Sequence, residues 1–236
     1  MTRPRSGGRP VRIEALPQSL LIDADRSALI VVDMQNDFCH AEGWVGAIGV
    51  DNSRLRRLYD PINAATAAAR SQGIPVIWVN WGVRPDRLNL SPGTQHPFNP
   101  DGAGPGLAGA VNGGAGSYRL LAKDEWGARI VDALEQGPDD VHVDKHRISG
   151  FWDTPLDAIL RNLDVTTLLF AGVNADHCVL GTLMDANFKG YDTILIEDCV
   201  ATTSPDFCLE ATLHNVRFCF GFTTTGSDLA AALAAS

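Results

Sequence analysis

Three reactive side chains each lie at or just beyond the end of a short apolar run: Asp33, Lys145 and Cys178. Such runs are typical of buried strands in a parallel sheet, and parallel strands place their C-terminal ends along one edge. The three side chains can therefore converge although the sequence separates them widely. A carboxylate beside a thiol can take its proton and return it to a leaving amine, and a nearby ammonium favours both negative charges. This combination of residues indicates nucleophilic catalysis by a cysteine.

Cys178 lies where a strand pattern changes into a helical one. Val179, Leu183 and Ala186 recur at helical spacing, and Gly190 ends the pattern. The free backbone N–H groups and the positive dipole end of a helix N-terminus favour a thiolate over a thiol. Taken alone, a cysteine beside a strand can equally be a small buried apolar residue. The same holds for its partners, since the carboxylate could cap a loop and the ammonium could be a solvated surface charge.

The composition limits the class of protein. The 236 residues are 45% hydrophobic, which is enough for one large core. A net charge of −9, from 19 basic and 28 acidic residues, argues against nucleic acid and acidic membrane surfaces as partners. No apolar stretch approaches the roughly 18 residues needed to cross a bilayer. Five scattered cysteines and a polar N-terminus favour the reducing cytoplasm.

Apolar runs alternate with amphipathic segments along most of the chain. We expect residues 1–25 to form an extended N-terminal arm that contacts a neighbouring subunit, and residues 26–236 to form one domain. Strands are predicted at 28–32, 75–80, 141–144, 167–171, 193–196 and 220–223, and helices at 52–72, 126–134, from 154, after 178 and at 206–216. This alternation predicts an α/β fold with a doubly wound, mostly parallel sheet and helices on both faces. The Gly/Pro-rich segment 81–117 is predicted to be a lid or a subunit contact.

Three segments resemble the isochorismatase-like cysteine hydrolases, which include nicotinamidases, N-carbamoylsarcosine amidase and the ureidoacrylate, biuret and triuret amidohydrolases. They read ALIVVDMQNDF, VDKHRISGFWDTPLDAIL and FAGVNADHCVLGTLMDANFKGYDTILIEDC. The resemblance runs from about Ala28 to Ser227 and implies a three-layer α/β/α fold. The segments SGFWDTPLDAIL and NVRFCFGF are most similar to the ureidoacrylate branch.

The resemblance also implies a role for each candidate residue. Cys178 corresponds to the nucleophile, Asp33 to the general acid and base, and Lys145 to their charged partner. A cis peptide is implied between Val173 and Asn174, with the backbone N–H groups of Asn174 and Cys178 forming an oxyanion hole. Many family members have threonine where Asn174 stands, but a backbone donor would survive that exchange.

Departures from the family narrow the expected activity. Metal-binding nicotinamidases have an Asp-x-His pattern after the first strand, whereas this chain reads Asp51-Asn52-Ser53. We therefore expect no metal and no other cofactor. No pair of histidines has the spacing of a helical zinc site. Biuret hydrolases have a substrate-binding glutamine near the last strand, where this chain reads Phe218-Cys219-Phe220, and this difference argues against biuret as the substrate.

Five residues that follow the relevant strand ends are expected to line the substrate slot: Phe38, Asn80, Trp81, Phe151 and Trp152. Flat apolar walls with one amide suit a small planar amide or ureide. The tryptophans could instead be core or subunit-contact residues. The predicted function is a cofactor-independent amidohydrolase that cleaves a C–N bond of a small ureido or carboxamide substrate. We expect it to act as a homo-oligomer, either a dimer or a tetramer.

Three alternative functions stay open. The first is a nicotinamidase-type or other small-amide hydrolase with the same three residues. The second is a vinyl-ether hydrolase resembling isochorismatase proper, although such enzymes work without a cysteine nucleophile. The third is a non-catalytic binding protein, because a fold does not establish an activity.

Overall fold

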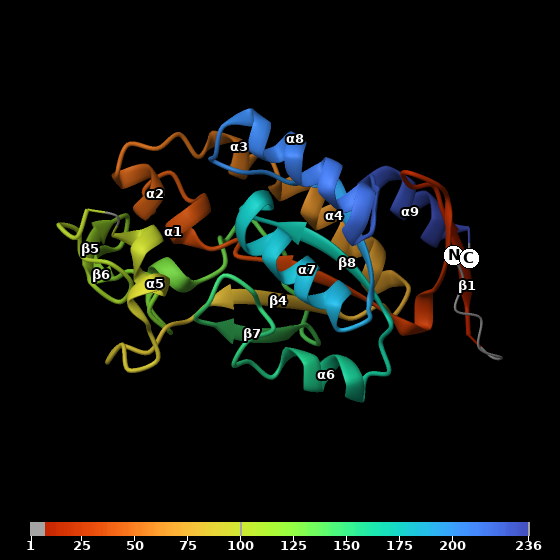
Figure 1. Cartoon of the computed structure of the whole chain (residues 1–236), viewed down its shortest axis with the longest axis horizontal. Helices are drawn as coiled ribbons and strands as arrows, with labels where there is room; N and C mark the ends of the chain where they lie inside the picture. Colours follow the sequence, from red (N-terminus) through yellow and green to blue (C-terminus); the bar gives the residue numbers. More distant parts are fainter. Residues whose placement is uncertain (1–7, 100, 236) are drawn as a thin grey trace.

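The computed structural model describes residues 8–99 and 101–235. Within them, a six-stranded parallel sheet has the strand order β10-β9-β8-β3-β4-β7. Figure 1 labels β4, β7 and β8 of this sheet. Its strands are β3 (Ser27–Val32), β4 (Val76–Trp81), β7 (Val141–Lys145), β8 (Thr167–Gly172), β9 (Asp192–Val200) and β10 (Phe222–Thr224). Two antiparallel hairpins lie outside this sheet: β1 (Pro10–Ile13) with β2 (Leu20–Asp23), and β5 (Ala110–Gly113) with β6 (Gly116–Arg119). The predicted parallel α/β sheet is confirmed.

The helices fill most of the connections between these strands. They are α1 (Asn36–Cys39), α2 (Trp44–Ala47), α3 (Ser53–Arg56), α4 (Tyr59–Ser71), α5 (Pro92–Gln95), α6 (Leu156–Asn162), α7 (Leu180–Phe188), α8 (Asp206–Asn215) and α9 (Gly226–Ala234). A π-helical turn at 175–179 leads into α7, and another at 216–220 extends α8. Among the described residues, no helix is long and apolar enough to span a membrane.

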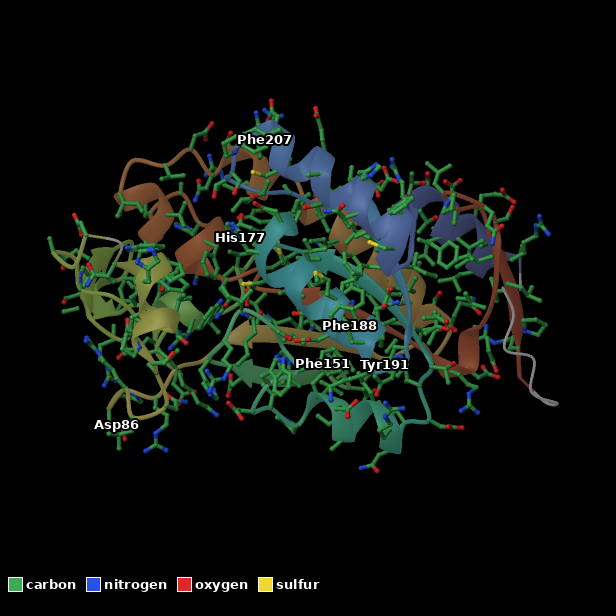
Figure 2. The ribbon with its side chains drawn as sticks, in the orientation of Figure 1. Asp86, Phe151, His177, Phe188, Tyr191 and Phe207 are labelled. Atoms are coloured by element: carbon green, nitrogen blue, oxygen red, sulfur yellow. The ribbon has the colours of Figure 1, made fainter. Side chains whose placement is uncertain are left out.

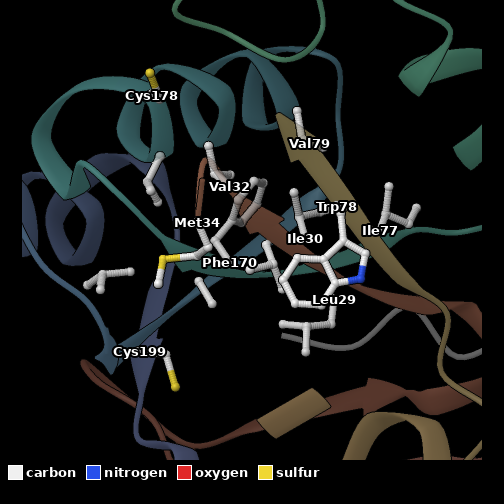
Figure 3. Close-up of a cluster of buried hydrophobic side chains, with 14 of the residues drawn as sticks. Leu29, Ile30, Val32, Met34, Ile77, Trp78, Val79, Phe170, Cys178 and Cys199 are labelled. Carbon is white, nitrogen blue, oxygen red and sulfur yellow. The ribbon is translucent and has the colours of Figure 1, made fainter. Parts of the chain in front are cut away.

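The two faces of the sheet can be told apart on β4, where successive side chains point in opposite directions. Trp78 donates from Nε1 to Asp140 Oδ2 at 2.7 Å, on the face that α4 covers. Val79 faces the other way, toward α7, because a Cβ on Gly150 would lie 2.6 Å from Val79 Cγ1 and 3.3 Å from the Thr182 side chain. Helix α9 packs on α4, whereas α6 and α8 flank α7 (Figure 1). Figure 3 shows the buried side chains that β3, β4 and β8 contribute to the core.

The N-terminal segment folds against its own chain in place of forming an extended arm. From residue 8 onward it makes the β1-β2 hairpin, which packs against α9. Val11 and Ile13 point inward and are buried, and Leu16 pairs with β10. The hairpin forms because these alternating apolar residues cover the end of the core. Residues 1–7 of the predicted arm lie outside the described residues.

The predicted helix at 126–134 is wrong. A single 3₁₀ turn occupies 126–128, and the backbone is extended at Arg129. The chain here crosses the ends of β3 and β4, where Ile130 pairs with Gln35 and the Asn36 N–H donates to the Arg129 carbonyl at 2.8 Å. These bonds to the turn after β3 replace the ones that a helix would make.

The glycine-rich segment after β4 is tied to α1 through Asp37. The Tyr118 hydroxyl donates to Asp37 Oδ1, and the Leu121 N–H donates to Oδ2 at 2.9 Å. The Trp44 N–H also donates to Oδ1, at 3.3 Å. Burial raises the pKa of the Asp37 carboxyl, against the lowering effect of these donors. Figure 1 shows the resulting group of β5, β6, α1, α2 and α5 at one end of the molecule.

Candidate active site

Asp33, Lys145 and Cys178 meet at the C-terminal edge of the sheet. Lys145 Nζ lies 2.9 Å from Asp33 Oδ2 and 3.4 Å from Cys178 Sγ. The same ammonium donates to the carbonyl of Arg147 at 3.1 Å. The Asp33 and Lys145 side chains are closed to solvent, and Cys178 is 5% exposed. The structure thus brings the three predicted residues around one buried positive charge.

The strand ends fix the carboxylate and the ammonium. Asp33 directly follows β3 in a left-handed conformation, with φ at 52°, which aspartate tolerates better than most residues. Its N–H donates to the Val79 carbonyl at 3.0 Å, and its Oδ1 accepts from the Trp81 N–H at 3.2 Å. Lys145 is the last residue of β7 and lies in register with Trp81 on β4. Adjacent strands therefore carry the two charged groups to the same place.

The turn after β8 fixes the thiol. The peptide between Val173 and Asn174 is cis, as the family resemblance implied. The Val179 N–H donates to the Asn174 carbonyl at 3.2 Å, and Asn174 Oδ1 accepts from the Thr203 N–H at 3.2 Å. The Thr182 hydroxyl donates to the Cys178 carbonyl at 2.6 Å. Cys178 is thereby held in the first turn of the helical segment that continues as α7.

Burial sets the protonation of this site. It raises the pKa of the Asp33 carboxyl, although Lys145, Cys178 and Trp81 all lower it. Burial, followed by the negative charge of Asp33, raises the pKa of Cys178 to about 12, against the lowering effect of Lys145. Burial and the charge of Asp33 therefore oppose the thiolate that the helix terminus and the Lys145 ammonium favour. A thiol lies beside a carboxylate with increased affinity for protons.

Trp81, which the sequence places in the substrate slot, contacts this cluster of three residues. Its ring lies under the Lys145 ammonium, with Nζ 4.0 Å from the ring centroid. Phe98 packs edge-on against the same indole, with ring centroids 5.1 Å apart. Phe38 is also buried, in α1.

Asn80 points away from this cluster, because it precedes Trp81 on β4 and so faces the opposite side of the sheet. It pairs with Asp144 and not with Lys145. With Trp81, His142 and Asp144 it lines a cavity of about 370 Å³ that also borders residues 128–130. The structure therefore does not place the Asn80 amide beside the Cys178 thiol.

Phe151 and Trp152 also lie away from the thiol. The loop after β7 turns where the Gly150 N–H donates to Thr182 Oγ1 at 3.0 Å, one helical turn beyond Cys178. Phe151 then packs against Tyr191, near the C-terminal end of α7 (Figure 2). Trp152 is 58% exposed and donates from Nε1 to Asp185 Oδ2 at 2.7 Å. The loop takes both aromatic rings along α7 rather than over its first turn.

Gln35 is a buried polar residue near the site that the sequence argument left without a role. Its Oε1 accepts from the Trp81 N–H at 2.9 Å, and its Nε2 donates to the carbonyls of Trp81 and Ala128, both at 2.7 Å. The available signal was an amide two residues after the candidate carboxylate, at the end of a buried strand. Across residues 8–99 and 101–235, no three His, Cys, Asp or Glu side chains are grouped so that they could hold a metal ion.

Comparison with known proteins places this geometry in a family. A family model described as an isochorismatase domain matches residues 27–228. Ureidoacrylate amidohydrolase RutB of a Methylorubrum extorquens strain is 35% identical over 226 residues, covering 94% of this chain and 89% of the relative. The protein of the same name from Klebsiella variicola is 35% identical over 218 residues, covering 90% of this chain and 89% of the relative.

Solved structures give the same result. A cysteine hydrolase from Pseudomonas syringae pv. phaseolicola 1448A superposes with a TM-score of 0.76 at 27% identity, covering 100% of this chain and 99% of the other. N-carbamoylsarcosine amidase from Thermoplasma acidophilum gives 0.65 at 25% identity, covering 85% of this chain and 96% of the other. The chain therefore belongs to the isochorismatase family of hydrolases.

Proposed function

We propose that this protein is a cysteine amidohydrolase that cleaves a C–N bond of a small ureido or carboxamide substrate through a covalent intermediate on Cys178. The observation that carries the proposal is the shared ammonium of Lys145, 3.4 Å from Cys178 Sγ and 2.9 Å from Asp33 Oδ2. A thiol, a carboxylate and an ammonium at these distances are the parts that such chemistry needs. The vinyl-ether alternative would leave the thiol without a role.

The first half of the reaction forms the covalent intermediate. As the sulfur attacks the carbonyl carbon, Asp33 takes the thiol proton, and the S–C bond forms. The raised pKa of the Asp33 carboxyl suits this transfer, because a more basic carboxylate is a better acceptor. The backbone N–H groups of Asn174 and Cys178 are the proposed donors to the oxyanion. Asp33 then returns the proton to the leaving nitrogen, the C–N bond breaks, and ammonia or an amine departs.

The second half releases the product. Asp33 takes a proton from a water molecule that attacks the thioester or thiocarbamate carbon, and the new C–O bond replaces the S–C bond. The proton then returns to the sulfur. The ammonium of Lys145 offsets the negative charge that moves between the carboxylate, the sulfur and the oxyanion. No redox cofactor or metal takes part in this sequence of steps.

The relatives support the substrate class. Those at 35% identity are named ureidoacrylate amidohydrolase, and one similar structure is an N-carbamoylsarcosine amidase. We therefore favour a small ureide over a simple carboxamide. The direct test is ammonia release from a panel of ureidoacrylate, biuret, triuret, nicotinamide and N-carbamoyl amino acids.

The test of the nucleophile is Cys178→Ser, with Cys219→Ser as a matched control, because Cys219 is an exposed free thiol on another element. Cys178→Ser should abolish hydrolysis and leave thermal unfolding unchanged, whereas Cys219→Ser should act as wild type. Hydrolysis at the wild-type rate by Cys178→Ser would disprove the covalent mechanism. Absence of hydrolysis across the whole panel, together with no mass increase on incubation with substrate, would favour a binding protein.

The remaining parts of the proposal are a cytoplasmic location and a homo-oligomer. Each of the five cysteines carries a free thiol, which suits a reducing compartment. Phe188, Phe207 and Phe218 are exposed by 66%, 66% and 81%, so apolar surface is present for contact between subunits. Light scattering coupled to gel filtration measures the oligomeric state directly, and a monomeric mass would contradict this part.

A further inference from the structure

The Trp81 indole forms the wall against which the Lys145 ammonium rests. Nζ lies 4.0 Å from the ring centroid, and the indole is almost fully buried. A cation over a tryptophan face is held most strongly where water is excluded. Because Asp33 and Cys178 share this ammonium, the ring helps to fix the charge on which both depend.

The indole N–H is the second feature of Trp81 that bears on the thiol. Trp81 Nε1 is buried and forms no conventional hydrogen bond within the described part of the chain. It lowers the pKa of the Cys178 thiol, although burial has the larger, opposite effect. An N–H donor forms a stronger hydrogen bond with an anionic sulfur than with a neutral thiol, so this N–H would stabilise the thiolate more than the thiol.

Gln35 fixes the backbone from which this indole projects. Its side-chain amide forms two hydrogen bonds with Trp81, accepting from the N–H at 2.9 Å and donating to the carbonyl at 2.7 Å. The second amide proton binds the Ala128 carbonyl, and Gln35 is fully buried. Asp33 Oδ1 accepts from the same Trp81 N–H at 3.2 Å. The turn that carries the candidate base therefore also holds Trp81.

We propose that Trp81 and Gln35 are positioning residues for the Cys178 nucleophile. Gln35 fixes the Trp81 backbone through two hydrogen bonds. Trp81 holds Lys145 with its ring and directs its N–H toward the developing thiolate. The inference rests on the proposed function, because it takes Cys178 to be the nucleophile. It replaces the expected role of Trp81 as a wall of the substrate slot. A substrate wall acts on KM, whereas a positioning residue acts on kcat and on the reactivity of the thiol without substrate.

The pH range of the test follows from the groups around the sulfur. Asp33 after β3 and Lys145 on β7 face it directly. Asp176 and His177 lie on the same turn as Cys178, with Asp176 Oδ2 3.3 Å from His177 Nε2. His146 follows Lys145 in the sequence. Burial and the charge of Arg147 lower the pKa of His146, so its imidazole is neutral above its usual titration range. Measurements between about pH 7.5 and 9 therefore isolate the thiol.

The experiment measures the second-order rate of iodoacetamide alkylation of Cys178 by peptide mass mapping. Trp81→Phe keeps a ring face and removes the N–H, Trp81→Leu removes both, and Gln35→Met removes the backbone clamp at similar volume. We expect alkylation at fixed pH to slow roughly three- to tenfold in Trp81→Phe and Gln35→Met, and further in Trp81→Leu. Below the thiol pKa the rate is proportional to the thiolate fraction, so a tenfold decrease corresponds to about one pKa unit.

Two variants serve as matched controls. Trp78→Phe removes an indole N–H from the same strand, but that N–H binds Asp140 on the opposite face of the sheet. Asn36→Leu removes an amide from the same turn as Gln35, but that amide binds the Trp126 carbonyl at 2.9 Å and makes no bond with Trp81. Both controls should alkylate at the wild-type rate. Thermal unfolding of every variant separates loss of folding from loss of positioning.

With a substrate identified from the panel, the Trp81 and Gln35 variants should lower kcat and leave KM nearly unchanged. Folded Trp81 variants that alkylate as wild type and raise KM alone would overturn the positioning role. Wild-type alkylation by Gln35→Met beside slow Trp81 variants would overturn the part assigned to Gln35. Failure of the proposed function would give a different result. Hydrolysis by the Cys178→Ser variant would show that Cys178 is not the nucleophile, whatever the Trp81 variants do.

Discussion

The carboxylate of Asp33 lies 2.9 Å from the ammonium of Lys145, and neither side chain is more than 1% exposed. A pair this deeply buried is costly to break, because removal of one partner leaves the other charge without water or a counter-charge. The same pair lies against Cys178, so its electrostatics and the reactivity of the thiol are coupled.

Asp33→Asn should separate alkylation from turnover. The negative charge of Asp33 raises the pKa of Cys178, so its removal should speed iodoacetamide labelling of the thiol at neutral pH. Hydrolysis should fall by about 10²- to 10⁴-fold, because the group that shuttles protons to the leaving nitrogen is gone. Labelling slower than wild type would contradict the charge argument, and retained hydrolysis would contradict the role of Asp33 as base.

Lys145→Met should have the opposite effect on labelling. Loss of the ammonium removes a contribution that lowers the pKa of Cys178, so alkylation should slow and turnover should fail. It also leaves Asp33 uncompensated, at a cost of about 3–5 kcal/mol in the free energy of unfolding. Lys123→Met is the control, since its ion pair with Asp144 is exposed and should contribute no more than about 1 kcal/mol. Equal losses of stability in urea denaturation would show that burial of the Lys145 pair does not matter.

The pH profile of kcat/KM should report a carboxylate base and a neutral thiol. The raised pKa of Asp33 means that the base becomes protonated, and activity falls, as pH decreases through a value above the usual 3.8. On the alkaline side, a thiol with a pKa of about 12 predicts no rise in activity near 8.5, where a free cysteine ionises. A profile that rises through pH 8.5 would instead indicate that a preformed thiolate is the active species.

Tyr118→Phe should loosen the segment that Asp37 ties to α1. The variant removes one of the donors to a buried carboxylate, and we expect a loss of about 1–3 kcal/mol in the free energy of unfolding. For a chain of this length each kcal/mol lowers Tm by about 2–4 °C. Scanning calorimetry measures the change, and Tyr59→Phe is a control that loses a hydroxyl bond to the neutral Cys39 carbonyl. A Tm equal to wild type would show that the Asp37 contacts contribute little.

Activity should survive exhaustive treatment with EDTA. The proposed steps use a thiol in place of metal-bound hydroxide. Metal analysis of the treated enzyme shows that removal is complete, and the ammonia assay then gives the remaining rate. Activity that disappears with the chelator and returns with zinc or iron would require a different mechanism.

The sequence was informative where a feature depends on local pattern. The buried runs at β3, β4 and β8 predicted a parallel sheet, and the reactive residues at their ends predicted which edge would carry the site. Helix α9 also begins at a local signal, a threonine whose Oγ1 accepts from the Asp228 N–H, although the predicted elements end before it.

Other features depend on contacts between distant parts of the chain, which a single sequence does not encode in any simple pattern. The 126–134 segment has helical spacing, but its backbone bonds with Gln35 and Asn36 after β3. The pKa of the Cys178 thiol depends on its burial and on the charge of Asp33, and the helical pattern after residue 178 carries neither. The positions of Phe151 and Trp152 depend on the bond between Gly150 and Thr182.

The opposite orientations of Asn80 and Trp81 have a consequence for how this family can diversify. The pleat turns the Trp81 ring toward Lys145 and the Asn80 side chain toward the opposite side of β4, although both residues border the cavity beside Asp144. Insertion of one residue in β4 ahead of Asn80 would exchange their sides, and would present an amide to Lys145 where the indole now lies. A change in strand length, with no substitution at any reactive residue, would therefore give the same nucleophile a different chemical environment.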